Sequence, residues 1–302
     1  MSLEASIEDY ADHQLEPLFE LFRSYFQPDD RLLTATYTRW LYAENPFGLA
    51  RMVKVAEGER WVGFMAMIPV ELARRGERLR AYYVVNVLVH PEFLGKRLFG
   101  RMITAAKKLV SDENAVIMGH PNDLALKSWQ RGGMHFHEVL KPGLVSPRLR
   151  AKGMRACGVS DIKQLQTALS LLTAAAAEAP TWRLAVTSDY IDWRFLCHPT
   201  NIYRVQLLQH NRFPAGFTVT RRIRPGIHLL IDQFTLEPYT ADALGCLPWL
   251  TISFKPNSFM REFSGPLWPL PLKKQIPFFC TNYQQPFTPG DVMNLGLSAS
   301  DF

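Results

Sequence analysis

Two segments of this chain repeat one pattern at a constant offset of 153 positions. The first, Tyr37 to Phe64, is YTRWLYAENPFGLARMVKVAEGERWVGF, and the second, Tyr190 to Phe217, is YIDWRFLCHPTNIYRVQLLQHNRFPAGF. Without a gap they match at Tyr37/Tyr190, Trp40/Trp193, Pro46/Pro199, Arg51/Arg204, Gly63/Gly216 and Phe64/Phe217. The offset is far longer than the roughly 20 to 50 residues of a solenoid repeat. We therefore interpret the pair as the duplication of a whole domain.

The length and composition agree with two domains. The chain has 302 residues, of which 47% are hydrophobic and 21% charged, as in ordinary globular proteins with room for large cores. A domain of roughly 150 residues is typical. We therefore expect one domain at residues 1–150 and a second at 151–302, with a linker in the basic, glycine-broken segment at 146–160.

The charge, the cysteines and the N-terminal residues indicate which ligands and which location to expect. The net charge of +6 suits a protein that meets anions, such as the phosphates of a small cofactor. The four cysteines form no C-x-x-C pair, so we expect buried thiols and no metal site. The first residues are acidic and polar, and no apolar run reaches about 18 residues, so we expect a cytoplasmic protein without a membrane span.

Each copy begins with a helical pattern, at residues 15–26 in the first and 161–180 in the second. A short helix around Tyr-x-x-Trp then ends before Pro46 or Pro199. In the first copy a hairpin follows, with strands at 50–56 and 61–72. Near the C-terminus, residues 264–279 are rich in proline, which predicts an irregular connection and no central strand.

The segment after the first hairpin can bind an anion. Residues 82–89 form a β-branched run that ends at His90 and Pro91, and an apolar face with helical spacing begins at Leu98. The short loop between them carries Gly95 and Gly100. A glycine-bearing turn that opens a helix presents unpaired amides and the positive end of the helix dipole, here with Lys96, Arg97 and Arg101 nearby. We expect a phosphate group to bind there.

A second strand and helix follow. Residues 116–118 are a short apolar strand, Asn122 or Asp123 caps a helix that ends at Gly132 and Gly133, and residues 134–141 return as a strand. This order, from the strand and the His-Pro pair through the loop and helix to the Asn-capped helix, resembles the GNAT acyltransferase superfamily. The resemblance implies an α+β fold in which two GNAT-like domains each contain a mixed, mainly antiparallel sheet flanked by helices.

The resemblance also implies a ligand and a reaction. Acetyl-CoA or another acyl-CoA would be the co-substrate, without a metal, and an amine on a small molecule or peptide would be the acceptor. We expect no nucleic acid partner, and an oligomer is left open. The implied coenzyme A site comprises Val87, Leu88, Val89, Gly95, Lys96, Arg97, Leu98, Phe99, Gly100 and Asn122, with a strand amide near residues 87–89 as oxyanion donor.

The sequence departs from the family pattern at two places. The loop motif Arg/Gln-x-x-Gly-x-Gly/Ala falls on Leu94, Arg97 and Phe99, none of which conforms. Trp129 stands where the family often has a tyrosine as general acid, and an indole N–H has no useful acidity. The catalytic residues are therefore not assigned. Glu92, His90 and His120 are candidates for the base by their chemistry, and Glu44 is a more remote one.

The second copy is expected to keep the fold and lack the anion site. The connection after its strand at 227–234 has no glycine and carries Glu237 and Asp242, which would repel a pyrophosphate. A helix is expected at 240–247. Two alternatives to an acyl-CoA-dependent N-acyltransferase are left open: a non-catalytic binding module on the same scaffold, and a transferase that uses aminoacyl-tRNA and binds RNA in a salt-dependent way.

Overall fold

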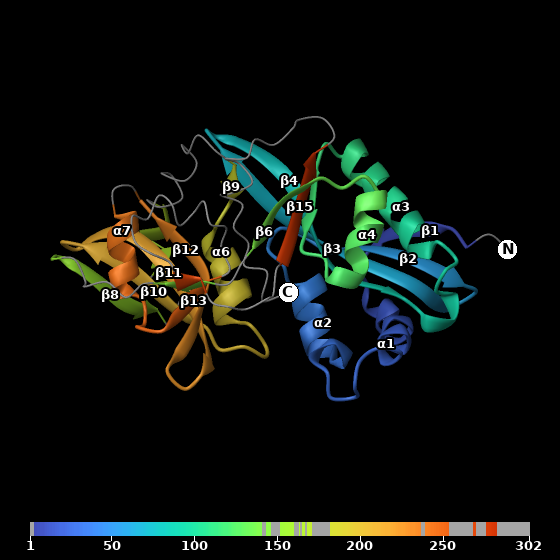
Figure 1. Ribbon diagram of the computed structural model, residues 1–302, viewed down its shortest axis with the longest axis horizontal. Coiled ribbons are helices and arrows are strands. Elements are labelled where there is room, and N and C mark those ends of the chain that lie inside the picture. The colour runs from blue at the N-terminus through green and yellow to red at the C-terminus, as the bar shows by residue number, and fades with distance from the viewer. Residues whose placement is uncertain are drawn as a thin grey trace. The chain divides into compact units, whose positions relative to one another are not determined.

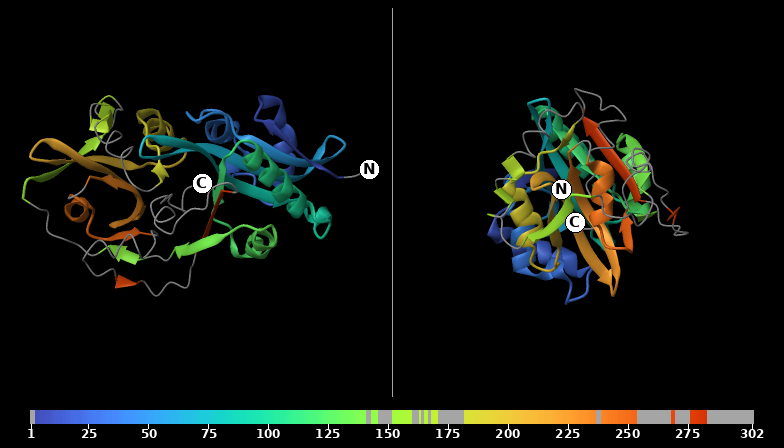
Figure 2. Two further views of the ribbon diagram at one scale, coloured as in Figure 1. Left: turned by 90° about the horizontal axis from the view of Figure 1, so that it is seen from above. Right: turned by 90° about the vertical axis from the view of Figure 1, so that its left-hand side faces the viewer.

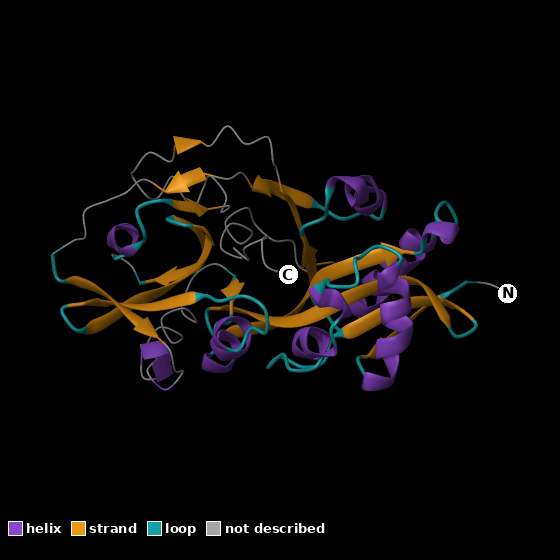
Figure 3. Cartoon of the chain, turned by 90° about the horizontal axis from the view of Figure 1, so that it is seen from below, coloured by secondary structure: helices purple, strands orange, loops and turns teal. Residues whose placement is uncertain are grey.

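The computed structural model describes residues 3–140, 143–145, 152–159, 163, 165–166, 168–170, 182–236, 239–253, 268–269 and 276–282. The chain divides into two compact units, one of residues 1–71, 79–137 and 277–287 and the other of residues 72–78, 138–276 and 288–302. Each unit contains a mixed, mainly antiparallel sheet with helices, so the α+β class is confirmed (Figures 1 and 3). The boundary at residue 150 stays a prediction.

The first sheet contains, in spatial order, β1 Ala5–Asp9, β2 Arg51–Glu57, β3 Arg60–Arg74, β4 Glu77–Val89, β5 Val116–Gly119, β15 Ile276–Asn282 and β6 Phe136–Leu140, and β9 Arg183–Leu184 pairs with β3. Its helices are α1 Leu15–Arg23, α2 Ala35–Tyr42, α3 Leu98–Asp112 and α4 Asp123–Arg131, and its short 3₁₀ turns are η1 Asp12–Gln14, η2 Arg31–Leu33 and η3 Pro91–Phe93. These elements confirm the predicted order from the first helix to the strand after Gly133.

The second sheet contains, in spatial order, β14 Trp268–Pro269, β7 Gly143–Val145, β13 Thr251–Ser253, β12 Ile227–Thr235, β11 Phe213–Arg224, β10 Arg204–His210 and β8 Met154–Val159. Its helical elements are α6 Ser188–Ile191, the π-helical turn η4 Asp192–Leu196, α7 Thr240–Ala243 and the 3₁₀ turn η5 Leu244–Cys246. Within the described residues, no helix in the chain is long and apolar enough to cross a membrane.

The repeated segment folds in the same way in both copies. In the hairpin β2–β3 the pairs run from Arg51 with Met67 to Glu57 with Arg60, and in β10–β11 from Arg204 with Thr220 to His210 with Phe213. Every pair of the first hairpin maps onto a pair of the second at the offset of 153. The β-bulge falls after Val55 in one and after Leu208 in the other. The shared register extends the sequence repeat to the backbone.

The matched aromatic residues are part of the core in both copies. Tyr37, Trp40 and Phe64 are buried in the first copy, and their partners Tyr190, Trp193 and Phe217 are buried in the second. Tyr37 packs on Trp40 with ring centroids 5.2 Å apart, and Tyr190 packs on Trp193 at 5.9 Å. Large aromatic surfaces of this kind are a main source of core stability. These six positions are therefore framework.

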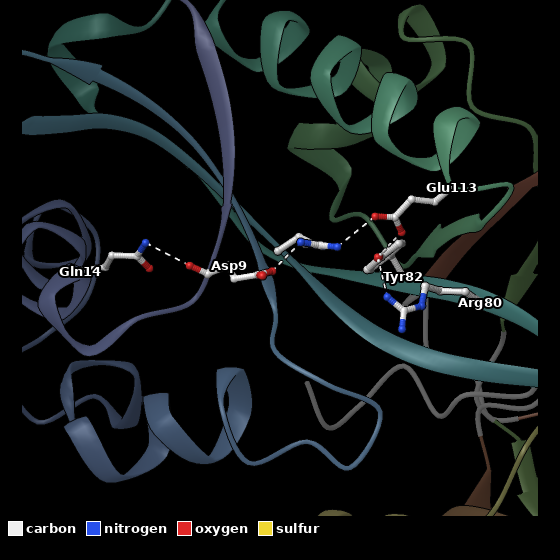
Figure 4. A network of polar contacts seen from close by, with 6 residues as sticks. Asp9, Gln14, Arg80, Tyr82 and Glu113 are labelled. Atoms are coloured by element: carbon white, nitrogen blue, oxygen red, sulfur yellow. Dashed lines mark hydrogen bonds and ion pairs between the residues drawn. The ribbon is translucent and has the colours of Figure 1, made fainter.

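The matched arginines differ between the copies. Arg51 pairs with Asp9 of β1 at 2.6 Å and with Glu113, which follows α3, at 3.0 Å. Glu113 also accepts a hydrogen bond from the hydroxyl of Tyr82 on β4. Figure 4 shows this network, which links three strands to the end of α3. Arg204 is exposed and has no ion pair among the described residues.

Each sheet contains a strand that comes from a distant part of the sequence. In the first sheet β15, from the end of the chain, lies between β5 and β6 (red in Figure 1, and seen from two further sides in Figure 2). In the second sheet the early strand β7 takes the corresponding place between β13 and β14. Both strands run antiparallel to their neighbours β5 and β13, and each of those runs parallel to the strand before it.

Four sequence predictions were wrong. The predicted linker contains β8, because its Val159 to Met154 pair with β10 along the whole strand. The proline-rich segment at 264–279 includes the start of β15, an interior strand. Pro277 lies before the pairs with β5, which begin at Phe279, so it removes none of their hydrogen bonds. The helix at 240–247 ends at Ala243 and continues only as a 3₁₀ turn.

The fourth error concerns the cysteines. Cys246 and Cys280 are buried, but Cys157 and Cys197 are exposed. Cys157 lies in β8, which is the last strand at its end of the second sheet among the described residues. The helix predicted at 161–180 lies mostly outside the described residues. Its described positions Leu165, Ala168 and Leu169 are buried.

Candidate functional site

The candidate site of the first unit begins where β4 and β5 stop pairing. The parallel pairs run from Ala81 with Val116 to Val84 with Gly119, and β4 then continues to Val89 without β5. Asn86 adopts a left-handed backbone conformation at φ 52°, which asparagine tolerates better than most residues. Its side chain donates to the hydroxyl of buried Tyr42 at 2.7 Å. This bond holds the irregular residue at the point of divergence.

Beyond Asn86, one edge of β4 faces away from β3. The amide of His90 donates to the carbonyl of Val62 on β3 at 2.9 Å. Backbone groups of successive strand residues point to opposite edges, so the polar groups of Val89 and Val87 point away from β3. The hydroxyl of Tyr25 donates to the carbonyl of Val89 on that edge. The N–H groups of Val87 and Val89 are thus available donors beside the divergence.

The loop after β4 leads directly to the N-terminus of α3. Gly95 has φ 81°, and Arg97, the N-cap of α3, has φ 62° and makes no side-chain cap. Arg97 therefore takes the left-handed conformation that favours glycine, at a cost of about 1 kcal/mol. The backbone shape expected of a glycine in the family motif is retained although the residue is arginine. In helix geometry the first amides of α3, at residues 98–100, have no acceptor inside the helix.

Space and charge around these amides suit an anion. A Cβ at Gly100 would meet nothing within 4 Å. Lys96 and Arg97 are exposed, and the Lys96 ammonium lies 3.9 Å from the centroid of the Phe93 ring. Arg101 points elsewhere, because its guanidinium donates to the carbonyl of Leu3. The loop thus offers two exposed cations that form no ion pair among the described residues, and the positive end of a 15-residue helix.

The other predicted coenzyme residues lie as follows. Leu98 is buried in the core and Phe99 is half-buried, so of these two only their amides are suited to a ligand. Asn122 caps α4, because its side-chain oxygen accepts from the amide of Ala125 at 2.9 Å. Leu88 lies on β4 between the two open amides. Residues 87–89 end β4, and residues 95–100 lead from the following loop into α3. Whether they bind coenzyme A stays a prediction.

Trp129 lies in the core and away from solvent. Its side chain is 2% exposed and packs against Phe99 at 5.4 Å and Phe279 at 4.7 Å between ring centroids. Phe279 belongs to β15, so the tryptophan packs α4 against this late strand of the first sheet. A packed indole is neither acidic nor mobile, and it provides no proton for a leaving group.

The four candidate bases are in different environments. Glu44 is exposed on a turn. Glu92 pairs with Arg60 at 3.0 Å, and the Arg60 guanidinium also lies 2.9 Å from Nε2 of His90. Glu92, His90 and Arg60 of β3 thus contact one another at the start of the loop before α3. In the sequence, this group lies after the residues of β4 that do not pair with β5.

His120 is placed differently, directly after the last residue of β5. Its Nδ1 is hydrogen-bonded to the hydroxyl of Tyr83, and its ring lies 4.8 Å from that of Phe278. Burial lowers the pKa of His120 to about 3, so the imidazole is neutral near pH 7. His120 was a candidate from the sequence, but its partner Tyr83 was not. A single histidine directly after a buried strand was the only available signal.

Comparisons with known proteins agree with this geometry. Residues 6–125 match the family model described as an acetyltransferase (GNAT) domain. Among curated proteins, none matches the sequence significantly. The fold resembles a GCN5-related N-acetyltransferase from Kribbella flavida, with a TM-score of 0.67 and 14% identity over 92% of this chain and 70% of that one.

Two further structures show the same fold. A GCN5-related N-acetyltransferase from Anabaena variabilis has a TM-score of 0.64 and 13% identity, over 92% of this chain and 73% of that one. The N-myristoyltransferase of Saccharomyces cerevisiae, solved with myristoyl-CoA, has a TM-score of 0.56 and 13% identity, over 98% and 90%. Residues 6–125 are therefore a GNAT domain, and the two-sheet architecture fits two GNAT-like domains in tandem.

Proposed function

We propose that this protein is an N-acyltransferase that transfers an acyl group from acyl-CoA to an amine, using the first domain. The observation that carries the proposal is the open edge of β4 at Val87 and Val89, next to an uncapped N-terminus of α3. A thioester that lies along β4 would place its pyrophosphate at this helix. GNAT membership of residues 6–125 supports acyl-CoA as the co-substrate.

The helix end and the strand edge have separate tasks in this proposal. The amides at residues 98–100 and the cations of Lys96 and Arg97 hold the phosphates. The N–H of Val87 or Val89 donates to the thioester carbonyl oxygen, and this bond strengthens as negative charge develops there. The amine nitrogen bonds to the carbonyl carbon, the carbon–sulfur bond breaks, and coenzyme A leaves as the thiol after taking up a proton from water.

Removal of the amine proton is assigned to water positioned by His120 and Tyr83. His120 stays neutral near pH 7, so it offers hydrogen bonding without charge. A pKa near 3 makes it a weak proton acceptor, which favours a positioning role over that of a full general base. The expected result for His120→Ala is a kcat lower by about 10-fold, which is less than the roughly 10²-fold loss of a full general base, because water can still accept the proton without the histidine. The KM for acyl-CoA should change little.

The second candidate function is a binding module without catalysis. Trp129 favours it, because the position of the family's tyrosine acid is filled by a side chain packed in the core. The module would still bind coenzyme A at the α3 N-terminus. Turnover of acetyl-CoA with a panel of amines, followed by release of the free thiol, distinguishes the two functions.

Binding of acetyl-CoA, measured by titration calorimetry on the full chain, tests the proposed function directly. Gly100→Glu places a carboxylate beside the helix amides in open space and should weaken binding by on the order of 10- to 100-fold, through charge repulsion. A glutamate in the first turn favours the helix, so the fold should be retained. Gly158→Glu, on the exposed edge strand β8, is the matched control.

The outcomes separate clearly. Binding that is lost in Gly100→Glu and kept in Gly158→Glu supports the site. Absence of binding by the unmodified protein at millimolar acetyl-CoA would overturn both the enzyme and the module. Salt-dependent RNA binding without a response to acetyl-CoA would instead favour the aminoacyl-tRNA-dependent transferase.

A further inference from the structure

One face of the second sheet carries buried polar atoms that have no hydrogen-bond partner. Within the part of the chain that the structure describes, the atoms on this face are Oε1 of Gln206, Oγ1 of Thr218, Oγ1 of Thr220, Nδ1 of His228 and both amide atoms of Gln233. The side chains of Gln206, Thr218 and Gln233 are 3%, 0% and 8% exposed. Most buried polar groups in folded proteins are paired, so a cluster of this kind requires an explanation.

The strand register places these residues side by side. Gln206 on β10 pairs with Thr218 on β11, and Thr218 pairs with Gln233 on β12. Directly paired residues lie on one face with Cβ atoms about 5 Å apart. This row therefore brings two amides and a hydroxyl together. We call Gln206, Thr218, Thr220 and Gln233 the polar row.

Thr220 and His228 continue the face along the strands. Thr220 is two residues from Thr218, about 7 Å along β11, and therefore points to the same side. Arg222 is two residues further and pairs with His228 on β12. Asp232 pairs with Val219 and so belongs to the opposite face. The described strand pairing thus places no carboxylate on this side of β11 and β12.

In the first domain, the matching face of the sheet is part of the apolar core. The counterparts of Gln206, Thr218 and Thr220 at the repeat offset are Val53, Met65 and Met67, which are part of the apolar core under α3. In the second domain the corresponding helix α7 has only four residues, and it packs near Leu208 and Ala215 at one end of the sheet (Figure 1). Among the described residues, polar side chains therefore stand on this face of the second sheet where the first sheet has the apolar core under α3.

Positive charge lies at one end of the polar row. The strand register places Arg222 opposite His228 and Arg204 opposite Thr220, and burial, followed by the charges of these two arginines, lowers the pKa of His228. Arg204 and Arg222 are exposed and form no ion pair among the described residues. An anionic group beside the polar row could pair with these two arginines.

We propose that the polar row of the second domain is a binding site for a small polyhydroxylated molecule that carries one anionic group, of the chemical class of the sugar phosphates. The hydroxyls of such a molecule can both donate to and accept from Gln206, Thr218 and Gln233, which matches the mixture of donors and acceptors in the row. The anionic group lies toward Arg204 and Arg222. The proposal is independent of the coenzyme A site, because all of its residues are in the second domain.

Thermal unfolding of the full chain at low salt tests the site. The probes are glucose 6-phosphate, ribose 5-phosphate and glycerol 3-phosphate, with glucose and inorganic phosphate as partial ligands. We expect at least one sugar phosphate to raise the Tm more than glucose and phosphate do at the same concentration. If no sugar phosphate raises the Tm, or if phosphate alone has the full effect, the proposal is wrong.

Thr218→Val separates a ligand site from a site filled by internal water. The valine removes an unpaired hydroxyl, so the free protein should melt about 2 °C higher or more, while the shift with sugar phosphate should be lost. Thr281→Val in the first domain is the matched control: its hydroxyl accepts from the amide of His135 at 3.3 Å, so this change should lower the Tm and keep the shift. A lower Tm in Thr218→Val together with an unchanged ligand shift would indicate bound water only and overturn the proposal.

Discussion

The hairpins β2–β3 and β10–β11 have the same strand register and the same bulge, but they support different surfaces. In the first, one face is apolar and lies under the 15-residue helix α3. In the second, the same face carries the polar row, and the described helix that follows β12 has four residues. Backbone register depends on turn geometry and on the bulge, so it persists when side chains change. The duplication thus preserved a scaffold and allowed two different surfaces on it.

The largest expected effect tests whether the repeated aromatic residues have the same role in both copies. Trp40→Ala and Trp193→Ala should each lower the free energy of unfolding by about 3–5 kcal/mol, because each removes a large buried side chain. Urea unfolding followed by circular dichroism measures the loss. If Trp40→Ala kept its stability and lost acetyl-CoA binding, Trp40 would be a ligand contact and the comparison would fail.

The second prediction concerns the matched glycines, which we expect to differ. A Cβ at Gly216, where φ is 155°, would lie 2.3 Å from the carbonyl oxygen of Phe234. Gly216→Ala should therefore lower the free energy of unfolding by about 1–3 kcal/mol, because the backbone must move. At Gly63 the nearest atoms are the flexible Sδ of Met102 and the Cβ of Val55, both at 3.4 Å, so Gly63→Ala should cost less than about 1 kcal/mol. Equal losses in the two variants would contradict this difference.

The third prediction uses the pH dependence of stability to test the burial of His120 in the first domain. Since burial lowers the pKa of His120 to about 3, the unfolded chain binds a proton below about pH 6.5 and the folded chain does not. The stability from His120 is present above pH 6.5 and is lost as the pH falls toward 3. Between pH 7.5 and 5.5 the loss should be at most about 1.4 kcal/mol, and less because the side chain is only half-buried. Urea unfolding at both pH values should show a smaller loss in His120→Asn, and an unchanged loss would refute the assignment.

The smallest effect concerns the matched arginines. Arg51→Ala breaks pairs with Asp9 and Glu113 that are partly exposed, so it should cost about 1 kcal/mol. Arg204→Ala breaks no ion pair among the described residues and should change the free energy of unfolding by less than about 0.5 kcal/mol. It should, however, reduce the Tm shift with sugar phosphate. A loss for Arg204→Ala as large as that for Arg51→Ala would show that the second copy has an ion network of its own.

Much of the fold could be predicted from local signals. The hairpin strands are apolar runs on either side of a polar turn, α3 has an apolar face at helical spacing, and Asn122 has the chemistry of a helix cap. Each of these signals depends on neighbours within a few residues. The errors came where the signal was weak or misleading: β8 is short and basic, and β15 begins beside a proline.

The candidate site was predicted in part for the same reason. The loop at 95–100 follows its strand directly, so its place at the helix N-terminus was expected from the sequence. The contact between Tyr83 and His120 joins residues 37 positions apart, and neither residue alone indicates the other. The left-handed conformations of Asn86 and Arg97 depend on the bond to Tyr42 and on the entry into α3. Such features come from packing.

The sequence by itself indicated the repeat, the shared hairpins and the place of the loop at residues 95–100 before α3, because repeat spacing, apolar runs and turn residues act locally. Only the tertiary structure decided which strands complete each sheet. The places of β15 and β7 depend on pairing across more than a hundred residues, which no local pattern specifies. It also decided that Gln206, Thr218 and Gln233 form one buried row, because three separate strands must align before their polar groups meet.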